Sequence, residues 1–145
     1  MSKCSEVMTK NPTVCVPSDT VADVAQIMKK ENVGPVPIVG DRQSRKLVGM
    51  VTDRDLAIKV VAERRDAEAT TVEEVMSRRV VTCRSEDDLQ EALEAMSKNQ
   101  LRRIPVVDDN GGIVGIIAQA DVATRAHEPA KTAEVVEKIS QSKKR

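Results

Sequence analysis

The sequence contains no phenylalanine, tyrosine or tryptophan. Each aromatic side chain buries a large apolar area, so a core without them depends on aliphatic side chains and methionine. Hydrophobic residues still make up 40% of the 145 residues and charged residues 32%, which is typical of a globular chain. That length suits one compact domain or two small halves packed together. We therefore expect a folded chain whose stability needs a second subunit or a ligand.

Other absences exclude whole classes of protein. Lys+Arg and Asp+Glu both number 23, so the basic excess of a typical nucleic-acid-binding protein is missing. No apolar run approaches the length of a membrane span, and the first ten residues lack the apolar stretch of a secretory signal. The three cysteines form no CxxC motif and no Cys/His cluster. These features predict a cytoplasmic protein with no nucleic-acid partner, no membrane partner and no metal site.

What the sequence does contain is an internal repeat. VMTKNPTVCV, starting at Val7, matches VMSRRVVTCR, starting at Val75, 68 positions later (75 − 7). The same offset relates Pro37 to Pro105. It becomes 66 (115 − 49) between Gly49 and Gly115, because the first copy has two extra residues in its GDRQSRK loop. The chain therefore consists of two related halves.

Each half shows the same series of elements. Apolar residues at helical spacing run from Val21 to Met28 and again from Leu89 to Met96, with Ser18 and Ser85 as the expected N-caps. Two short β-branched runs follow each predicted helix, and DDNGG between the second pair favours a hairpin turn. Second helices are expected near Asp53 and Gln119. Each half is thus predicted to form a strand, a helix, two further strands and a second helix, in that order.

A sheet with helices on one face leaves its other face uncovered, so two such halves are expected to cover each other. The predicted fold class is α/β. The predicted boundaries are repeat 1 at residues 1–61, a polar linker at 62–70, repeat 2 at 71–127, and a C-terminal helix and basic tail at 128–145. His127, the sole histidine, is expected to have a surface role.

The repeated motifs resemble those of CBS domains, named after cystathionine β-synthase, arranged as the tandem pair called a Bateman module. The resemblance rests on VM(T/S) at Val7 and Val75, the strands with Pro37 and Pro105, and VG-x-(V/I)-x-x-x-D from Val48 and Val114. It covers roughly residues 3 to 126. Each motif alone is common, so the resemblance depends on all of them occurring in the same order in both halves of the chain.

The resemblance implies two βαββα repeats with pseudo-twofold symmetry and two clefts between them. Each cleft of such a module can take an adenosyl ligand, and many such modules form homodimers. The resemblance therefore implies a regulatory sensor of AMP, ADP or ATP, with no catalytic activity and with an unidentified regulated protein. The alternative is a structural or protein-interaction module whose clefts are degenerate, and an enzyme is a third possibility supported only by association.

Thr52 and Asp55 have two interpretations. They fit a capping box at the start of a helix, which alone would explain them. In the family, this motif contacts ribose and phosphate, where a helix N-terminus and a carboxylate suit both groups. The repeat context favours ligand binding. The second copy, GIIAQAD, keeps Asp121 but has Ala118 in place of the threonine.

The family geometry crosses the repeats, so each carboxylate is expected to face the other repeat. Asp55 would face Val80, Val81, Leu101, Arg102 and Arg103, and Asp121 would face the segment around Thr13 and the turn at residues 33–35. The adenine would lie among aliphatic side chains, including Met50. The arginines would bind phosphate, although a solvated pair or a salt bridge explains one of them nearly as well. We therefore expect the Asp55 cleft to bind more tightly than the Asp121 cleft.

Overall fold

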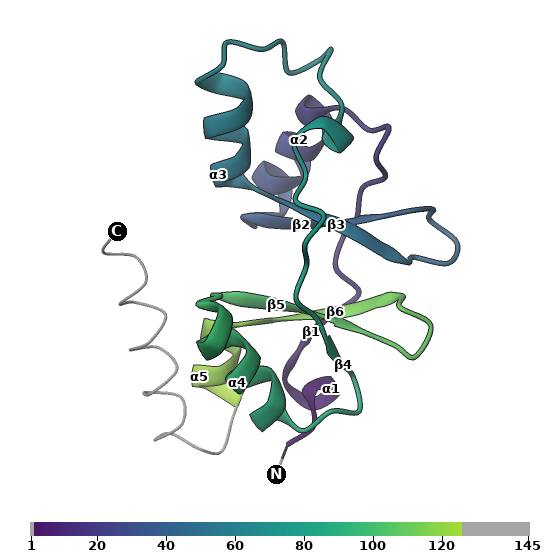
Figure 1. Cartoon of the computed structure of the whole chain (residues 1–145), viewed down its shortest axis with the longest axis vertical. Coiled ribbons are helices and arrows are strands. Elements are labelled where there is room, and N and C mark those ends of the chain that lie inside the picture. The colour runs from purple at the N-terminus through teal and green to yellow at the C-terminus, as the bar shows by residue number, and fades with distance from the viewer. Residues whose placement is uncertain (1, 126–145) are drawn as a thin grey trace. The chain divides into compact units, whose positions relative to one another are not determined.

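The computed structural model describes residues 2–125, apart from the side chains of 123–125, and divides into two compact units (Figure 1). Unit 1 contains the chain up to Asn11, Val81–Asn110 and the chain from Val114 onward. Unit 2 contains Pro12–Val80 and Gly111–Ile113. His127 and the predicted C-terminal helix and basic tail lie outside the described residues.

Unit 2 is built around a hairpin whose two strands run antiparallel, with Val36 opposite Val51. Cys15 adds a parallel bridge to Ile38 on the outer side of the hairpin. The elements of unit 2 are α2 (Val21–Glu31), β2 (Pro35–Val39), β3 (Leu47–Thr52), α3 (Asp53–Leu56), the π-helical turn η1 (Ala57–Val61) and the 3-10 turn η2 (Val72–Glu74). Helices α2 and α3 lie on one face of the hairpin (Figure 1).

Unit 1 has a four-stranded sheet in the order β1-β6-β5-β4. Its elements are α1 (Cys4–Val7), β1 (Thr9–Lys10), β4 (Cys83–Arg84), α4 (Leu89–Asn99), β5 (Arg103–Val107), β6 (Ile113–Ala118) and α5 (Gln119–Arg125). Cys83 pairs in parallel with Val106, as Cys15 does with Ile38 at the equivalent place in unit 2. The predicted strand, helix, strand, strand, helix order is therefore confirmed in both halves.

The two compact units exchange segments between the sequence repeats. Strand β1, from the first repeat, pairs with β6 of the second through Thr9 and Ile116. Ser77, from the second repeat, pairs with Met50 of β3 in the first, with N–H···O distances of 2.9 and 3.0 Å. Unit 1 thus gains a strand, and unit 2 a single β-bridge, from the segment that belongs by sequence to the other repeat. The compact units and the sequence repeats are different divisions of the chain.

This exchange explains why glycine stands at Gly49 and Gly115. A Cβ at Gly49 would lie 2.8 Å from the Ser77 carbonyl oxygen and 2.9 Å from the Met76 sulfur. A Cβ at Gly115 would lie 2.9 Å from the Thr9 carbonyl oxygen and closer still to the Met8 sulfur. The VM(T/S) motif of one repeat therefore packs directly on the glycine of the VG-x-(V/I) motif of the other.

The starts of the two long helices differ from the prediction. Helix α2 is capped by Thr20, whose hydroxyl accepts from the Asp23 N–H at 3.1 Å in a reciprocal capping box, and not by Ser18. Helix α4 begins after Asp88, so Ser85 is not its N-cap. Hydrogen bonds from distant segments set these starts: the Val21 N–H donates to the Thr70 carbonyl at 2.9 Å, and the Leu89 N–H donates to the Ser2 carbonyl at 2.8 Å.

Each unit has its own aliphatic core, as a chain without aromatic residues requires. The core of unit 2 joins the apolar stripe of α2 to the inner face of the hairpin, and its most buried members include Val24, Val36, Ile38 and Val51. The core of unit 1 joins α4 to β5 and β6 through Leu93, Met96, Ile104 and Ile117. These cores fix the ends of β3 and β6, where the predicted site residues stand.

Candidate functional site

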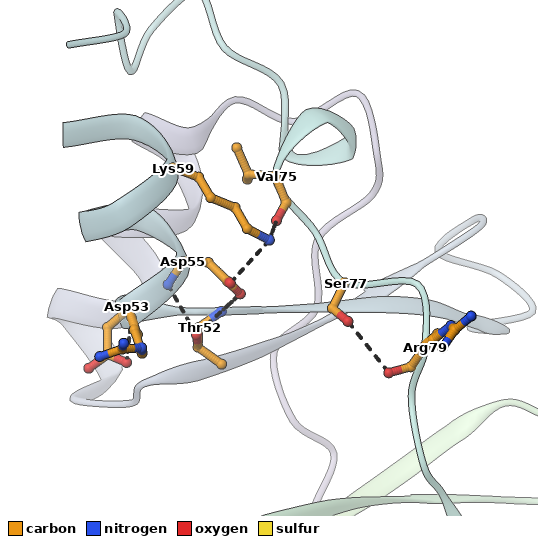
Figure 2. Close-up of polar contacts among 8 residues, drawn as sticks. Thr52, Asp53, Asp55, Lys59, Val75, Ser77 and Arg79 are labelled. Atoms are coloured by element: carbon orange, nitrogen blue, oxygen red, sulfur yellow. Dashed lines mark hydrogen bonds and ion pairs between the residues drawn. The ribbon is translucent and has the colours of Figure 1, made fainter. Parts of the chain in front are cut away.

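The Thr52–Asp55 turn is a reciprocal capping box in unit 2, at the point where β3 ends and α3 begins (Figure 2). The Thr52 hydroxyl accepts from the Asp55 N–H at 3.2 Å. In return, Asp55 Oδ2 accepts from the Thr52 N–H at 2.9 Å and from the Thr52 hydroxyl at 3.1 Å. The Asp55 side chain is 21% exposed. A partly exposed carboxylate is thus held in one orientation at the end of a buried strand.

The backbone at this turn differs from the expected phosphate site. That interpretation needed free N–H groups at the helix start, but the N–H groups of residues 52–55 are all engaged. The Asp53 N–H donates to the Gly34 carbonyl at 3.0 Å, and the Arg54 N–H donates to Asp53 Oδ1 at 3.0 Å. The remaining two make the capping box. In this arrangement, side chains and not backbone amides must provide any anion binding.

Lys59 is a member of the site that the sequence reasoning missed. Its ammonium lies 3.3 Å from Asp55 Oδ1 and donates to the Val75 carbonyl at 2.9 Å (Figure 2). The spacing of Asp55 and Lys59 is i,i+4, which on a helix places opposite charges side by side, so a sequence signal existed. The Val75 contact had no such signal, since the two residues are far apart in sequence. Beside them, the Ser77 hydroxyl donates to the Arg79 carbonyl at 3.5 Å.

The second copy of the motif, in unit 1, is simpler. Asp121 Oδ2 accepts from the Ala118 N–H at 2.9 Å, so the carboxylate still reaches back to the strand end. Ala118 supplies no hydroxyl to this turn, and the Thr9 hydroxyl instead donates to Asp121 Oδ1 at 3.4 Å. The Gln119 N–H donates to the Arg102 carbonyl at 3.0 Å, matching the Asp53–Gly34 bond of unit 2. The two carboxylates therefore have different surroundings, as the sequence predicted.

The remaining predicted residues fall in both units. Unit 2 holds Met50, Val80 and Thr13, with Asp55. Unit 1 holds Val81, Leu101, Arg102 and Arg103, with Asp121. The predicted grouping of residues across the repeats stays a prediction.

Within their own units, several of these residues have definite environments. The exposed Thr13 donates its hydroxyl to Glu31 at 2.6 Å, so this hydroxyl is engaged. Val81 and Leu101 are partly buried against the core of unit 1. Arg102 and Arg103 are exposed, and among residues 2–125 neither forms one of the observed salt bridges. Their guanidinium groups are therefore available to an anion.

All three cysteines are buried and free. Burial raises the pKa of the Cys15 thiol to about 12, with the nearby Asp19 carboxylate adding to the shift. Cys4 and Cys83 contact each other in unit 1. Hydrogen bonding between them lowers the pKa of Cys4, whereas the same contact, together with burial, raises the pKa of Cys83.

Two further observations concern metals and membranes. Across residues 2–125 the side chains of histidine, cysteine, aspartate and glutamate form no cluster of three or more that could hold a metal ion. No helix in this part of the chain is long and apolar enough to cross a membrane.

Two compact α/β units, each with a carboxylate at the end of a strand, define a tandem repeat architecture. The CBS domain family model matches residues 4–62 and 72–128, which is most of the chain. The CBS domain-containing protein YhcV of Bacillus subtilis is 39% identical over 123 residues, a match that covers 85% of this chain and 84% of that protein. The chain belongs to the CBS domain family, as a tandem pair.

Solved structures agree with this assignment. The CBS domain pair of protein MJ0100, in complex with 5′-methylthioadenosine and S-adenosyl-L-methionine, has a TM-score of 0.74 and 31% identity, covering 85% of this chain and 94% of that one. CBSX2 in complex with AMP has a TM-score of 0.72 and 26% identity, with the same coverage of both chains. Both of those proteins were therefore solved in complex with adenosyl compounds.

Proposed function

We propose that this protein is a regulatory module that binds an adenosyl ligand, with AMP, ADP or ATP as the best candidates, and that it has no catalytic activity of its own. The observation that carries the proposal is the Asp55 carboxylate. It is partly exposed at a strand end and oriented by Thr52. An ionised carboxylate only accepts hydrogen bonds, which suits the two hydroxyls of a ribose. Relatives with the same fold that bind adenosyl compounds support this reading.

The two sites are proposed to be unequal. The Asp55 site has a threonine hydroxyl at the strand end, whereas the Asp121 site has Ala118 at the equivalent position. One hydrogen bond to a charged group contributes about 1.5–3 kcal/mol, which corresponds to roughly tenfold or more in affinity. We therefore expect the Asp55 site to dominate binding.

Calorimetric titration with adenosine, AMP, ADP and ATP tests this proposal. Asp55→Asn should reduce nucleotide affinity by roughly tenfold or more, because asparagine keeps an oxygen for the Thr52 N–H but loses the charge and one acceptor. Asp53→Asn is the matched control, since Asp53 is an exposed carboxylate two residues away. Circular dichroism should confirm that both variants fold. Equal nucleotide affinities for Asp55→Asn and wild type would overturn the assignment of Asp55. A larger loss of affinity in Asp121→Asn than in Asp55→Asn would reverse the ranking of the two sites.

Arg102 and Arg103 are proposed as phosphate ligands, and the base is proposed to lie among Met50, Val80, Val81 and Leu101. Exposed charges are screened by salt. Affinity for ATP should therefore fall with added salt more steeply than affinity for adenosine, and Arg102→Gln with Arg103→Gln should remove the difference. An unchanged salt response in that double variant would show that the arginines do not bind the phosphates.

The structural alternative has two observations in its favour: Ala118 lacks the hydroxyl of Thr52, and the N–H groups of residues 52–55 are already bonded. Failure of wild type to bind any of the four ligands would favour this alternative. A cytoplasmic location and the regulation of a partner protein are part of the proposal.

We also propose that the protein forms homodimers through exposed apolar side chains of unit 2. Ile58 and Val61 stand three residues apart on η1, exposed by 46% and 73%. Large exposed aliphatic side chains on one short helical segment favour association with a second copy. Light scattering should give the mass of a dimer for wild type and of a monomer for Val61→Glu. A monomeric wild type would refute the proposal.

A further inference from the structure

Lys59 contacts one oxygen of the Asp55 carboxylate, which is proposed to bind the ribose. Its ammonium lies 3.3 Å from Asp55 Oδ1 and donates to the Val75 carbonyl at 2.9 Å (Figure 2). The Lys59 side chain is 44% exposed and that of Asp55 is 21% exposed. All three residues belong to unit 2, so the arrangement is complete within one compact unit.

The Asp55 carboxylate has few acceptor positions left. A carboxylate offers about four lone-pair positions. Among the described residues, the Thr52 N–H and hydroxyl both donate to Oδ2, and Lys59 contacts Oδ1. A ribose presents two neighbouring hydroxyls as donors. Both can donate to Asp55 only if one of the present contacts is released.

The Lys59 contact is the one most easily released. The Thr52 N–H bond, at 2.9 Å, belongs to the helix cap and is fixed by the backbone. The Thr52 hydroxyl both accepts from Asp55 and donates to it, so it is held from two sides. The Lys59 contact is longer, at 3.3 Å, and comes from a half-exposed, flexible side chain. Exposed ion pairs of this kind contribute little to stability.

A displaced Lys59 would remain near the site. Its bond to the Val75 carbonyl does not involve Asp55, so the ammonium keeps one anchor when it leaves the carboxylate. An ammonium that has lost an anionic partner is stabilised by another anion within reach. A phosphorylated adenosyl ligand provides such an anion and adenosine does not. The lysine therefore opposes the binding of every ribose at Asp55, but only a phosphate compensates for its displacement.

We infer that Lys59 is a specificity-determining residue, which competes with the ribose for Asp55 and thereby makes the site favour phosphorylated adenosyl ligands over adenosine. This inference rests on the proposed function, because it assumes that the ribose binds at Asp55. The selection by Lys59 depends on the charge of the ligand and is independent of any contact with Arg102 or Arg103.

Calorimetry on the full chain with adenosine and AMP tests the inference. Lys59→Met removes the competing charge, and Lys59→Gln removes the charge but keeps a donor for the Val75 carbonyl. Both variants should bind adenosine about two- to fivefold more tightly, the range expected when an exposed ion pair no longer competes. Both variants should bind AMP more weakly, so that the ratio of AMP affinity to adenosine affinity falls by about tenfold. Lys30→Met is the matched control, an exposed lysine of the same unit, and should leave the ratio unchanged.

The outcomes separate the inference from the proposed function. An unchanged ratio in Lys59→Gln, or equal weakening of both ligands, would overturn the role of Lys59 while leaving the proposed function intact. A wild type that binds neither ligand would overturn the proposed function and the inference together. If Lys59→Met is poorly folded by circular dichroism, Lys59→Gln alone decides the result.

Discussion

Replacing Gly49 by alanine tests whether the exchanged segment is held as the structure describes. The added methyl would lie 2.8 Å from the Ser77 carbonyl oxygen and 2.9 Å from the Met76 sulfur. The sulfur is part of a flexible side chain and can move, but the carbonyl belongs to the backbone. Ser77 exchanges two hydrogen bonds with Met50, the residue next to Gly49. The methyl therefore pushes apart the pairing that joins the second repeat's segment to β3.

The expected loss of stability follows from two opposing effects. Overpacking a well-packed site costs about 1–3 kcal/mol. Reducing the freedom of the unfolded chain by a glycine-to-alanine change restores about 0.4–1 kcal/mol. Gly49→Ala should therefore lower the free energy of unfolding by about 1–2 kcal/mol, on the basis of these two ranges. Urea denaturation measures this loss directly, and each kcal/mol should lower Tm by roughly 2–4 °C in a chain of this size.

Gly40→Ala is the matched control in the same hairpin. The nearest atom to a Cβ at Gly40 is a Val48 methyl at 3.6 Å, which is ordinary van der Waals contact, and Gly40 has no positive φ. This variant should be as stable as wild type or slightly more stable. If Gly49→Ala and Gly40→Ala unfolded at the same urea concentration, Ser77 could not lie where the structure places it, and the exchange of segments in unit 2 would be wrong.

The remaining predictions concern the helix cap and a buried thiol. In urea denaturation, Thr20→Ala should lower the free energy of unfolding by about 0.5–2 kcal/mol, because it removes the cap of α2, whereas Ser18→Ala should lower it much less. A larger loss for Ser18→Ala would identify Ser18 as the cap. Burial raises the pKa of Cys15 to about 12, so the thiol stays protonated in the folded chain at pH values where the unfolded chain loses this proton. Stability should therefore be full below the unfolded pKa of about 8.5 and fall as the pH rises above it, by about 1.4 kcal/mol between pH 7.5 and 9.5. Urea denaturation at both pH values should show a smaller fall in the free energy of unfolding for Cys15→Ala than for wild type. An identical fall in both proteins would show that Cys15 does not cause it.

The local features of this protein could be predicted from its sequence. The apolar stripes ending at Met28 and Met96 specify helices because residues three and four positions apart share a helix face. The Thr52–Asp55 capping box could also be predicted, since its donors and acceptors lie within one turn of the chain. The Asp55–Lys59 pair had a local signal of the same kind, although the sequence reasoning did not use it.

The tertiary structure alone decided which distant segments meet. The pairing of β1 with β6 and of Ser77 with Met50 brings together residues from different repeats, and no local pattern specifies such partners. Other long-range hydrogen bonds, from Val21 to Thr70 and from Leu89 to Ser2, accompany helix starts at Thr20 and Asp88 in place of Ser18 and Ser85. The hydrogen bonds of the Asp53 N–H to the Gly34 carbonyl and of Lys59 to the Val75 carbonyl likewise join residues that are distant in sequence. Backbone donors and acceptors must all find partners in a folded chain, and the choice between near and distant partners is made only when the chain packs.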